Sequence, residues 1–287
     1  MAETVGILAP MAVEMAPLWR EFRVTDTKAE AGLKMSRGWL RDRQVVLTIA
    51  GVGKVNGAAA AQALIDHWGA SALILTGVAG TLVPEVAPGD VVIATSHTQF
   101  DVGVVRPNHY TPMPIAARQK EGKVSRMRAV ASSGRLTRLA MERAKAANFP
   151  YQHGRRPRVI EGAVATGDSL ILWPEALARL ALELHVAAID MEGAAVAQVA
   201  QANGVEMVAV RGISDVAADL AKIELESVAG LGAAGSLKDR AAGVAGAARL
   251  VASRPANVIE LLRLARAMRG AARNAAVVVA QLVASLE

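Results

Sequence analysis

The chain of 287 residues contains no cysteine, and only 3% of its residues are aromatic. The absence of cysteine excludes a disulfide framework, a thiolate metal site and a cysteine nucleophile. No apolar run reaches the roughly 18 residues that a membrane-spanning helix requires, since the longest candidate, Ala275–Leu286, is interrupted by Gln281. Hydrophobic residues make up 53% of the chain, too large a share for an intrinsically disordered protein. We therefore expect a globular cytoplasmic protein.

The charge balance is basic, with 32 Lys and Arg residues against 26 Asp and Glu and a net charge of +6. Such an excess can indicate a nucleic-acid or membrane partner. Proteins that bind single-stranded nucleic acid usually stack the bases on aromatic side chains, and the few Trp, Tyr and Phe residues here are scattered singly. We therefore expect no nucleic-acid partner.

Short apolar runs alternate with segments of helical periodicity along the first 215 residues. The runs predict strands over Val5–Ala9, Gln44–Ala50, Ala72–Thr76, Val91–Ala94, Val159–Thr166, Ala187–Ile189 and Glu206–Val210. The periodic segments predict helices over Val13–Trp19, Ala58–His67, Leu136–Ala147, Pro174–Leu184 and Ala194–Asn203. This alternation predicts an α/β fold with a mostly parallel or mixed central sheet and helices on both faces. Thr98–Arg128, with mixed polarity and several prolines, is predicted to be a loop excursion.

Glycine and polar residues cluster directly after several predicted strands, namely after Ala50, Thr76, Thr166, Ile189 and Val210. In open α/β sheets, ligands bind outside the carboxyl ends of the strands. The clusters therefore form a candidate site as well as a series of turns.

Each cluster also has a purely structural interpretation. The Gly51–Gly57 segment fits neither the phosphate-loop nor the dinucleotide spacing, so we interpret it as a tight turn with Lys54 as a solvated side chain. Asp190 and Glu192 could stabilise a helix start or accept hydrogen bonds from the vicinal hydroxyls of a ribose. Asp215 could cap a helix or serve as a general acid with a raised pKa.

Glu14, just past the first predicted strand, also has a purely structural interpretation, as an acidic residue in the first turn of a helix. Together, however, the segments form an ordered series: Met11–Glu14, Gly51–Asn56, Thr76–Gly80, Thr166–Asp168, Asp190–Ala194 and Arg211–Asp215. The series resembles the purine nucleoside phosphorylase and nucleosidase family, in particular the 5′-methylthioadenosine/S-adenosylhomocysteine nucleosidases, over about residues 3–220.

The resemblance implies hydrolysis of the N-glycosidic bond of a 5′-modified adenosine, with release of adenine and with neither a cofactor nor a metal ion. Asp215 would protonate N7 of the departing purine, and Ser214 would hold Asp215 in position. Glu14 would bind and activate the attacking water.

The resemblance also assigns the substrate contacts. Met191 would pack on the sugar, and Glu192 would accept hydrogen bonds from its 2′- and 3′-hydroxyls. Backbone groups of Ile171 would read the adenine edge, while Leu170 would form an apolar wall where the family often has a stacking Phe. The remaining residues carried over are Val78, Ala79 and Gly80, which would line the pocket, and Arg211, which would support these groups from nearby.

Two alternatives stay open. Phosphorylases of the family often carry a phosphate-binding Arg and Ser where this chain has Leu75 and Val78, which favours water over phosphate as the nucleophile. A phosphorylase, including one acting on the hopanoid-linked adenosylhopane, is the first alternative, and a catalytically silent nucleoside-binding protein is the second. The family resemblance also implies a homodimer.

The chain divides, on this interpretation, into a catalytic domain over residues 1–220 and an Ala/Gly-rich segment with an amphipathic helix over 221–287. The helix is predicted over Asn257–Leu286, with apolar residues on one face. Arginines line another side, namely Arg263, Arg266, Arg269 and Arg273. We favour a helix docked on its own domain or on a dimer mate, with a solvated basic face, over attachment to an anionic membrane surface.

Overall fold

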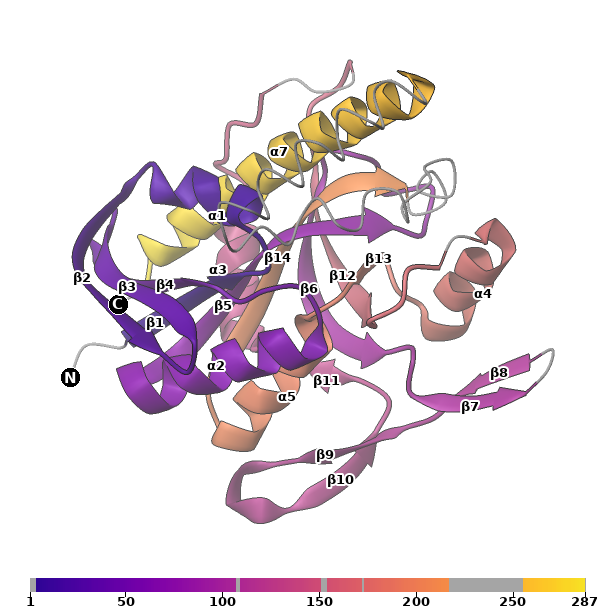
Figure 1. Ribbon diagram of the computed structural model, residues 1–287, viewed down its shortest axis with the longest axis horizontal. Helices are drawn as coiled ribbons and strands as arrows, with labels where there is room; N and C mark the ends of the chain where they lie inside the picture. Colours follow the sequence, from indigo (N-terminus) through magenta and orange to yellow (C-terminus); the bar gives the residue numbers. More distant parts are fainter. Residues whose placement is uncertain (1–3, 107–108, 151–153, 172, 217–254, 287) are drawn as a thin grey trace.

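The computed structural model describes residues 4–106, 109–150, 154–171, 173–216 and 255–286. Figure 1 shows a central sheet with helices packed against both of its faces. Within the described residues the sheet has ten strands, in the order β11-β6-β12-β13-β5-β1-β4-β3-β2, with β14 paired to β5 and β6. The predicted α/β class with a mixed central sheet is confirmed.

The middle of the sheet consists of strands that the apolar runs predict. β1 (Thr4–Ala9) lies between β4 (Arg43–Ile49) and β5 (Ala70–Thr81) and runs parallel to both. β14 (Glu206–Val216) also pairs in parallel with β5. Because helices cover both faces, the side chains of β1 from Val5 onward are buried on either side, which explains the near-continuous apolar runs.

The remaining inner strands close a ring. β12 (Val159–Thr166) pairs in parallel with β6 (Val91–Gln99) and with β13 (Ala188–Asp190). β13 also pairs antiparallel with β5, and β14 pairs antiparallel with β6. The strands β5, β14, β6, β12 and β13 thereby enclose a common centre, and β11 (Val130–Ala131) adds an antiparallel edge to β6.

The sequence pattern misses the two strands at one edge of the sheet. β2 (Phe22–Glu30) and β3 (Leu33–Leu40) extend the sheet antiparallel beyond β4. β2 is the edge strand and most of its side chains are exposed. Since an exposed edge favours polar side chains, the segment lacks the apolar run by which the inner strands are recognised.

The predicted loop excursion over Thr98–Arg128 is partly wrong. It begins within β6 and contains two short antiparallel hairpins, of which β7–β8 projects from the body of the molecule (Figure 1). The elements are β7 (Gly103–Arg106), β8 (His109–Pro112), β9 (Ile115–Arg118), a 3₁₀ turn (Lys120–Gly122) and β10 (Val124–Met127).

Helices α2 (Lys54–Trp68) and α5 (Gly193–Asn203) cover one face of the sheet. Their buried alanines, with Leu64 and Val196, share a core cluster with residues of β1, β5 and β14. α4 (Pro174–Leu184) lies to one side of the ring, where Leu180 packs in a smaller cluster with residues of β12 and the end of β6.

The opposite face is covered by α1 (Ala12–Trp19), α3 (Gly134–Ala144) and the long α7 (Pro255–Val283). Side chains of all three helices form one buried cluster with β1, β4, β14 and β6. Helices on both faces confirm the layer arrangement that the sequence predicts.

The C-terminal helix belongs to this core. Val279, Leu282 and Val283 are fully buried, and the side-chain amide of Asn274 donates a hydrogen bond of 2.7 Å to the carbonyl of Gly89. The C-terminal part of the second predicted segment therefore shares the hydrophobic core of the first. Residues 217–254 lie outside the described residues, so the division at residue 220 stays a prediction.

The arginine-bearing side of α7 faces solvent. Its arginines, namely Arg263, Arg266, Arg269 and Arg273, are exposed. The helix is thus docked on its own chain with a basic outer face, as the favoured interpretation has it. In the described part of the chain, no helix combines the length and apolar character needed to cross a membrane.

The close approach of α7 to β14 requires glycine at position 212. A Cβ there would lie 2.5 Å from the carbonyl carbon of Ala271 and 3.0 Å from its Cα. We expect Gly212→Ala to lower the free energy of unfolding by about 1–3 kcal/mol, because backbone cannot move aside cheaply. The matched control is Gly134→Ala, where the nearest atom is the end of Arg138 at 3.5 Å and helix propensity favours alanine. Urea denaturation of both variants measures the difference, and equal stabilities would contradict the packing argument.

Candidate functional site

A buried arginine holds the centre of the site. The Arg211 side chain is 0% exposed, and its Nε and Nη2 donate to Asp190 Oδ2 over 2.9 and 2.7 Å. Nη2 also donates to Glu192 Oε2 at 3.0 Å, and Nη1 to the carbonyl of Thr76 at 3.3 Å. Burial alone would lower the pKa of Arg211, but the neighbouring carboxylates outweigh it and raise the pKa. The guanidinium thus carries a permanent positive charge among acidic side chains.

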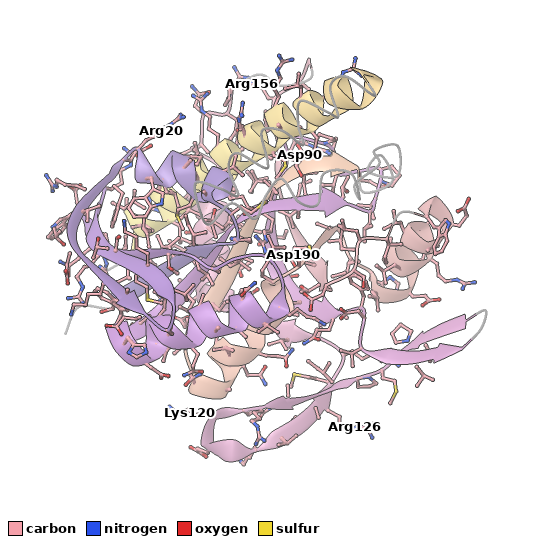
Figure 2. All side chains as sticks on the ribbon, in the orientation of Figure 1. Arg20, Asp90, Lys120, Arg126, Arg156 and Asp190 are labelled. Carbon is pink, nitrogen blue, oxygen red and sulfur yellow. The ribbon has the colours of Figure 1, made fainter. Side chains whose placement is uncertain are left out.

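Asp190 ends β13 and is positioned from several directions. Thr166 Oγ1 donates to Asp190 Oδ1 at 2.6 Å, and the backbone N–H of Gly193 donates to the same carboxylate at 3.2 Å. The backbone N–H of Ala194 in turn donates to Thr166 Oγ1 at 2.9 Å. Asp190 therefore stabilises the start of α5, as one of its two predicted roles has it, while a contact with ribose hydroxyls stays a prediction. Figure 2 places Asp190 in the interior, while basic side chains such as Arg20 lie at the periphery.

Glu192 is 3% exposed and lies between Arg211 and the Gly51–Lys54 turn. Its Oε1 accepts a hydrogen bond of 2.8 Å from the backbone N–H of Gly53. Burial raises the pKa of Glu192, against the attraction of Arg211. Each carboxylate oxygen keeps a lone pair that can accept a hydrogen bond from a hydroxyl group in the cavity.

Glu14 is clamped between α1 and β5. Its Oε2 accepts from the backbone N–H of Met11, and its Oε1 accepts from that of Val78, both at 2.7 Å. Burial raises the pKa of Glu14 to about 7, against the opposing effects of Arg211 and the two backbone donors. The first contact closes the start of α1, and the second lies across the sheet, so Glu14 is more than a helix-start acid.

Gly77 makes this approach possible. Its φ of 146° lies outside the usual range of other residues. A Cβ at this position would lie 2.5 Å from Glu14 Oε1 and 2.7 Å from Arg211 Nη1. Any side chain at position 77 would therefore displace both charged groups.

A cavity of about 380 Å³ opens above these groups. It brings together the predicted residues Glu14, Val78, Ala79, Gly80, Leu170, Ile171, Met191, Glu192 and Ser214. Arg211 lies beneath the cavity and reaches it through Glu192. The walls are mostly apolar and the carboxylates are gathered on one side, an arrangement that suits a ligand with one apolar and one hydroxyl-bearing part.

The backbone of Asp215 lies at the end of this wall. Its register partner is Gly80 of β5, and the pairing shifts between Ile213 and Asp215. The Asp215 side chain is outside the described part of the structure, and its role stays a prediction. Ser214, next to it, lines the cavity and donates to the Ala79 carbonyl at 3.4 Å.

Several lining residues are absent from the sequence prediction. Leu264 and Met268 of α7 form part of the wall, although the sequence assigns this helix to an extension. Met11 and Val52 belong to the predicted motifs but have no predicted role, and the others lie beside the motifs or in α4, namely Pro10, Ser169, Ile189 and Leu177. Only proximity to the motifs could have pointed to this second group, and no sequence signal marks the α7 residues.

Lys54 is not the solvated side chain that the sequence suggests. Its Nζ lies 2.7 and 2.8 Å from the two oxygens of Asp101, and the Lys54 side chain is only 20% exposed. The backbone N–H of Lys54 donates to Asp168 Oδ1 at 2.8 Å, and that of Asp168 donates to Asp101 at 2.9 Å. This network joins the turn that holds Glu192 to the ends of β6 and β12.

In the part of the chain that the structure describes, no group of three or more His, Asp or Glu side chains is arranged to hold a metal ion. The described residues of the cavity lining include neither Lys nor Arg.

Comparison with known sequences identifies relatives over most of the chain. The sequence profile of the phosphorylase superfamily matches residues 4–252. A 5′-methylthioadenosine/S-adenosylhomocysteine nucleosidase of Mycobacterium bovis is 32% identical over 83% of this chain and 95% of its own length. The nucleosidase of the same name from Shewanella loihica is 31% identical over 78% of this chain and 90% of its own.

Comparison with solved structures gives the same fold. Futalosine hydrolase of Helicobacter pylori superposes with a TM-score of 0.73 and 22% identity, over 100% of this chain and 99% of that chain. The nucleosidase of Neisseria meningitidis in complex with methylthio-immucillin-A has a TM-score of 0.71 and 24% identity, over 99% of this chain and 100% of that chain.

We expect the Lys54–Asp101 pair to stabilise the turn. Because both side chains are about four-fifths buried, Lys54→Met should lower the free energy of unfolding by about 1–2 kcal/mol, between the values for exposed and buried pairs. A double-mutant cycle with Asp101→Asn isolates the coupling energy. The matched control is the exposed pair Arg41–Glu21, whose side chains are about half exposed. Equal coupling energies in the two cycles would contradict the prediction.

The raised pKa of Glu14 should be visible in stability. The pKa is about 7 in the folded chain against a usual value of 4.5, so between these pH values the folded state holds more protons than the unfolded state. The contribution of Glu14 to the free energy of unfolding therefore falls as pH rises from about 4.5 to about 7. Urea titrations across this range measure the free energy of unfolding of the original chain minus that of Glu14→Gln. We expect this difference to fall by on the order of 3 kcal/mol as the pH rises. If this difference in the free energy of unfolding did not change with pH, the raised pKa of Glu14 would be disproved.

Proposed function

We propose, because the chain belongs to the phosphorylase superfamily, that it is an N-ribosyl hydrolase that releases adenine from a 5′-modified adenosine of the 5′-methylthioadenosine or S-adenosylhomocysteine type. The observation that carries the proposal is Glu14, a buried carboxylate with a pKa of about 7 at the wall of a nucleoside-sized cavity. The nucleosidases of Mycobacterium bovis and Shewanella loihica, at 32% and 31% identity, support the same activity.

Glu192 would bind the sugar. Its oxygens already accept from Gly53 and Arg211, which hold the carboxylate in one orientation. The remaining lone pairs would accept from the 2′- and 3′-hydroxyls, and Met191 would pack on the sugar from the same wall. Arg211 and Asp190 would act through Glu192 and the backbone rather than on the substrate.

Glu14 would activate the attacking water. A base is most effective when its pKa lies near the working pH, and a pKa of about 7 satisfies this condition. Glycosidic cleavage passes through a species resembling an oxocarbenium ion. Among the described residues, Glu14, Glu192 and Asp190 surround the cation Arg211, so this group of side chains carries an excess of negative charge that would stabilise such a species.

Asp215 would protonate N7 of the purine, which makes adenine a neutral leaving group. The support is its place in the Arg211–Asp215 motif and its backbone pairing with Gly80 beside the cavity. Leu170 and Ile171 would form the apolar wall and backbone edge for the base, as both line the cavity.

Water is favoured over phosphate by the charges around the cavity. Leu75 is fully buried at the position where phosphorylases often have an arginine. Val78 has no polar side chain, and its backbone N–H already donates a hydrogen bond to Glu14. Lys54, the nearest cation along the Gly-rich turn, is paired with Asp101. These contacts leave no positive group in the described lining to hold a phosphate ion.

A homodimer and a cytoplasmic location are further parts of the proposal, carried by the family resemblance. The exposed arginines of α7 would be the part of that helix that contacts an anionic membrane surface, while its buried apolar residues pack in the core of its own chain. Light scattering and liposome flotation of the full chain would test these points.

Product analysis tests the proposed reaction. Incubation with 5′-methylthioadenosine, S-adenosylhomocysteine or adenosine should release adenine and a free ribose, with no acceleration by added phosphate. A phosphate-dependent reaction that yields ribose 1-phosphate would instead establish a phosphorylase. Asp215→Asn and Glu14→Gln should lower kcat by at least about a hundredfold, with folding checked by circular dichroism. Nucleoside binding by the original chain without any turnover would support the silent binding protein.

A further inference from the structure

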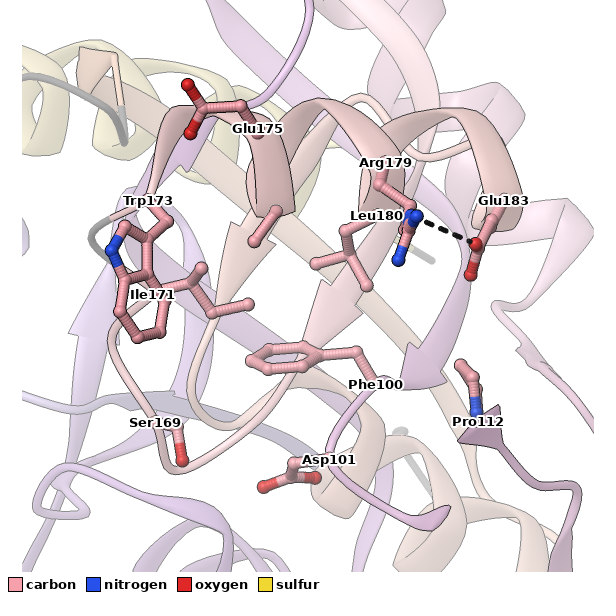
Figure 3. A pocket seen from close by; sticks show the side chains of 11 residues that line it. Phe100, Asp101, Pro112, Ser169, Ile171, Trp173, Glu175, Arg179, Leu180 and Glu183 are labelled. Atoms are coloured by element: carbon pink, nitrogen blue, oxygen red, sulfur yellow. Dashed lines mark ion pairs between the residues drawn. The ribbon is translucent and has the colours of Figure 1, made fainter. Parts of the chain in front are cut away.

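A second cavity lies directly beside the candidate site. Its volume is about 710 Å³, and its walls come from α4, the end of β6 and β8. Ser169 and Ile171 line both cavities, so the loop between β12 and α4 is their common wall. In Figure 3 the side chains of Ile171, Leu180 and Phe100 converge within it.

The deepest part of this cavity is lined by buried apolar side chains. Phe100 and Leu180 are 4% and 7% exposed and form its floor. Of the charged side chains, Asp101 pairs with Lys54, Arg179 lies 3.8 Å from Glu183 (dashed in Figure 3), and Glu175 is exposed. A ligand group in this space would therefore be apolar or aromatic rather than charged.

The position of the cavity decides which part of a nucleoside could reach it. The carboxylates that suit the sugar, Glu14 and Glu192, line only the first cavity, whereas the shared residues belong to the loop that also carries Leu170. A flat apolar base would rest against this loop. A substituent that continues from the base past Ile171 would then enter the second cavity.

We propose that this cavity accepts an apolar substituent on the exocyclic amine of the purine, so that the enzyme also cleaves N6-alkylated or N6-benzylated adenine nucleosides. The inference rests on the proposed nucleosidase function and extends its substrate class. A secondary amine keeps one N–H for a hydrogen bond, while its substituent gains burial against Phe100 and Leu180. The sugar-binding and water-activating groups are unaffected, because they lie on the other side of the base.

The test compares 5′-methylthioadenosine with its N6-benzyl derivative. We expect kcat/KM for the two to agree within about tenfold in the original chain, with N6-benzyladenine as the released base. Ala176→Trp, which would fill the second cavity, should lower the benzyl-to-parent ratio by about ten- to a hundredfold. Ala176→Leu should give a smaller decrease. The matched control is Leu182→Trp on the same helix, at a position that is 75% exposed, which should leave the ratio unchanged.

The outcomes separate the two proposals. If neither nucleoside is cleaved, the proposed function fails. If the parent is cleaved and the benzyl derivative is more than about a thousandfold poorer, the second cavity is not a substituent site and the inference is overturned. The inference is also overturned if Ala176→Trp leaves the ratio unchanged but alters the oligomeric state in light scattering, since the cavity would then lie in an interface between copies.

Discussion

The structure depends on one buried cation. Arg211 is fully buried and would be costly to the fold without its carboxylate partners. Its contacts with Asp190, Glu192 and the Thr76 carbonyl tie β14 to β13, to the start of α5 and to β5. The same contacts orient the acidic groups of the cavity. The cation that offsets part of the buried negative charge therefore also orients the acidic groups of the site.

The ring of strands and α7 explain why these groups meet in one place. β13 pairs with both β12 and β5, and β14 pairs with both β5 and β6, so segments far apart in sequence surround one centre. α7 then packs on β14 across Gly212 and adds Leu264 and Met268 to the cavity wall. Stability and site geometry are coupled, because the helix that completes the core also completes the pocket.

Much of the fold was predictable because burial leaves a pattern in the sequence. The inner strands are covered on both faces and read as apolar runs, and the helices keep their apolar periodicity. β2 escapes prediction because it is an exposed edge strand with polar side chains. The pairing of Lys54 escapes prediction for another reason: its partner Asp101 lies in a segment remote in sequence, just after β6, and a charge pair of this kind leaves no periodic pattern.

The sequence by itself determined the family, through the order of the motifs from Met11–Glu14 to Arg211–Asp215, and the α/β class, through the alternation of apolar runs with helical periodicity. It also indicated many of the residues that line the cavity. Only the tertiary structure decided the electrostatic state of Glu14, whose pKa of about 7 results from burial against Arg211 and two backbone donors. It also decided that α7 belongs to the core and lines the pocket. The physical reason is that pKa values and cavity walls depend on distances between residues remote in sequence, and these distances exist only once the ring of strands has closed.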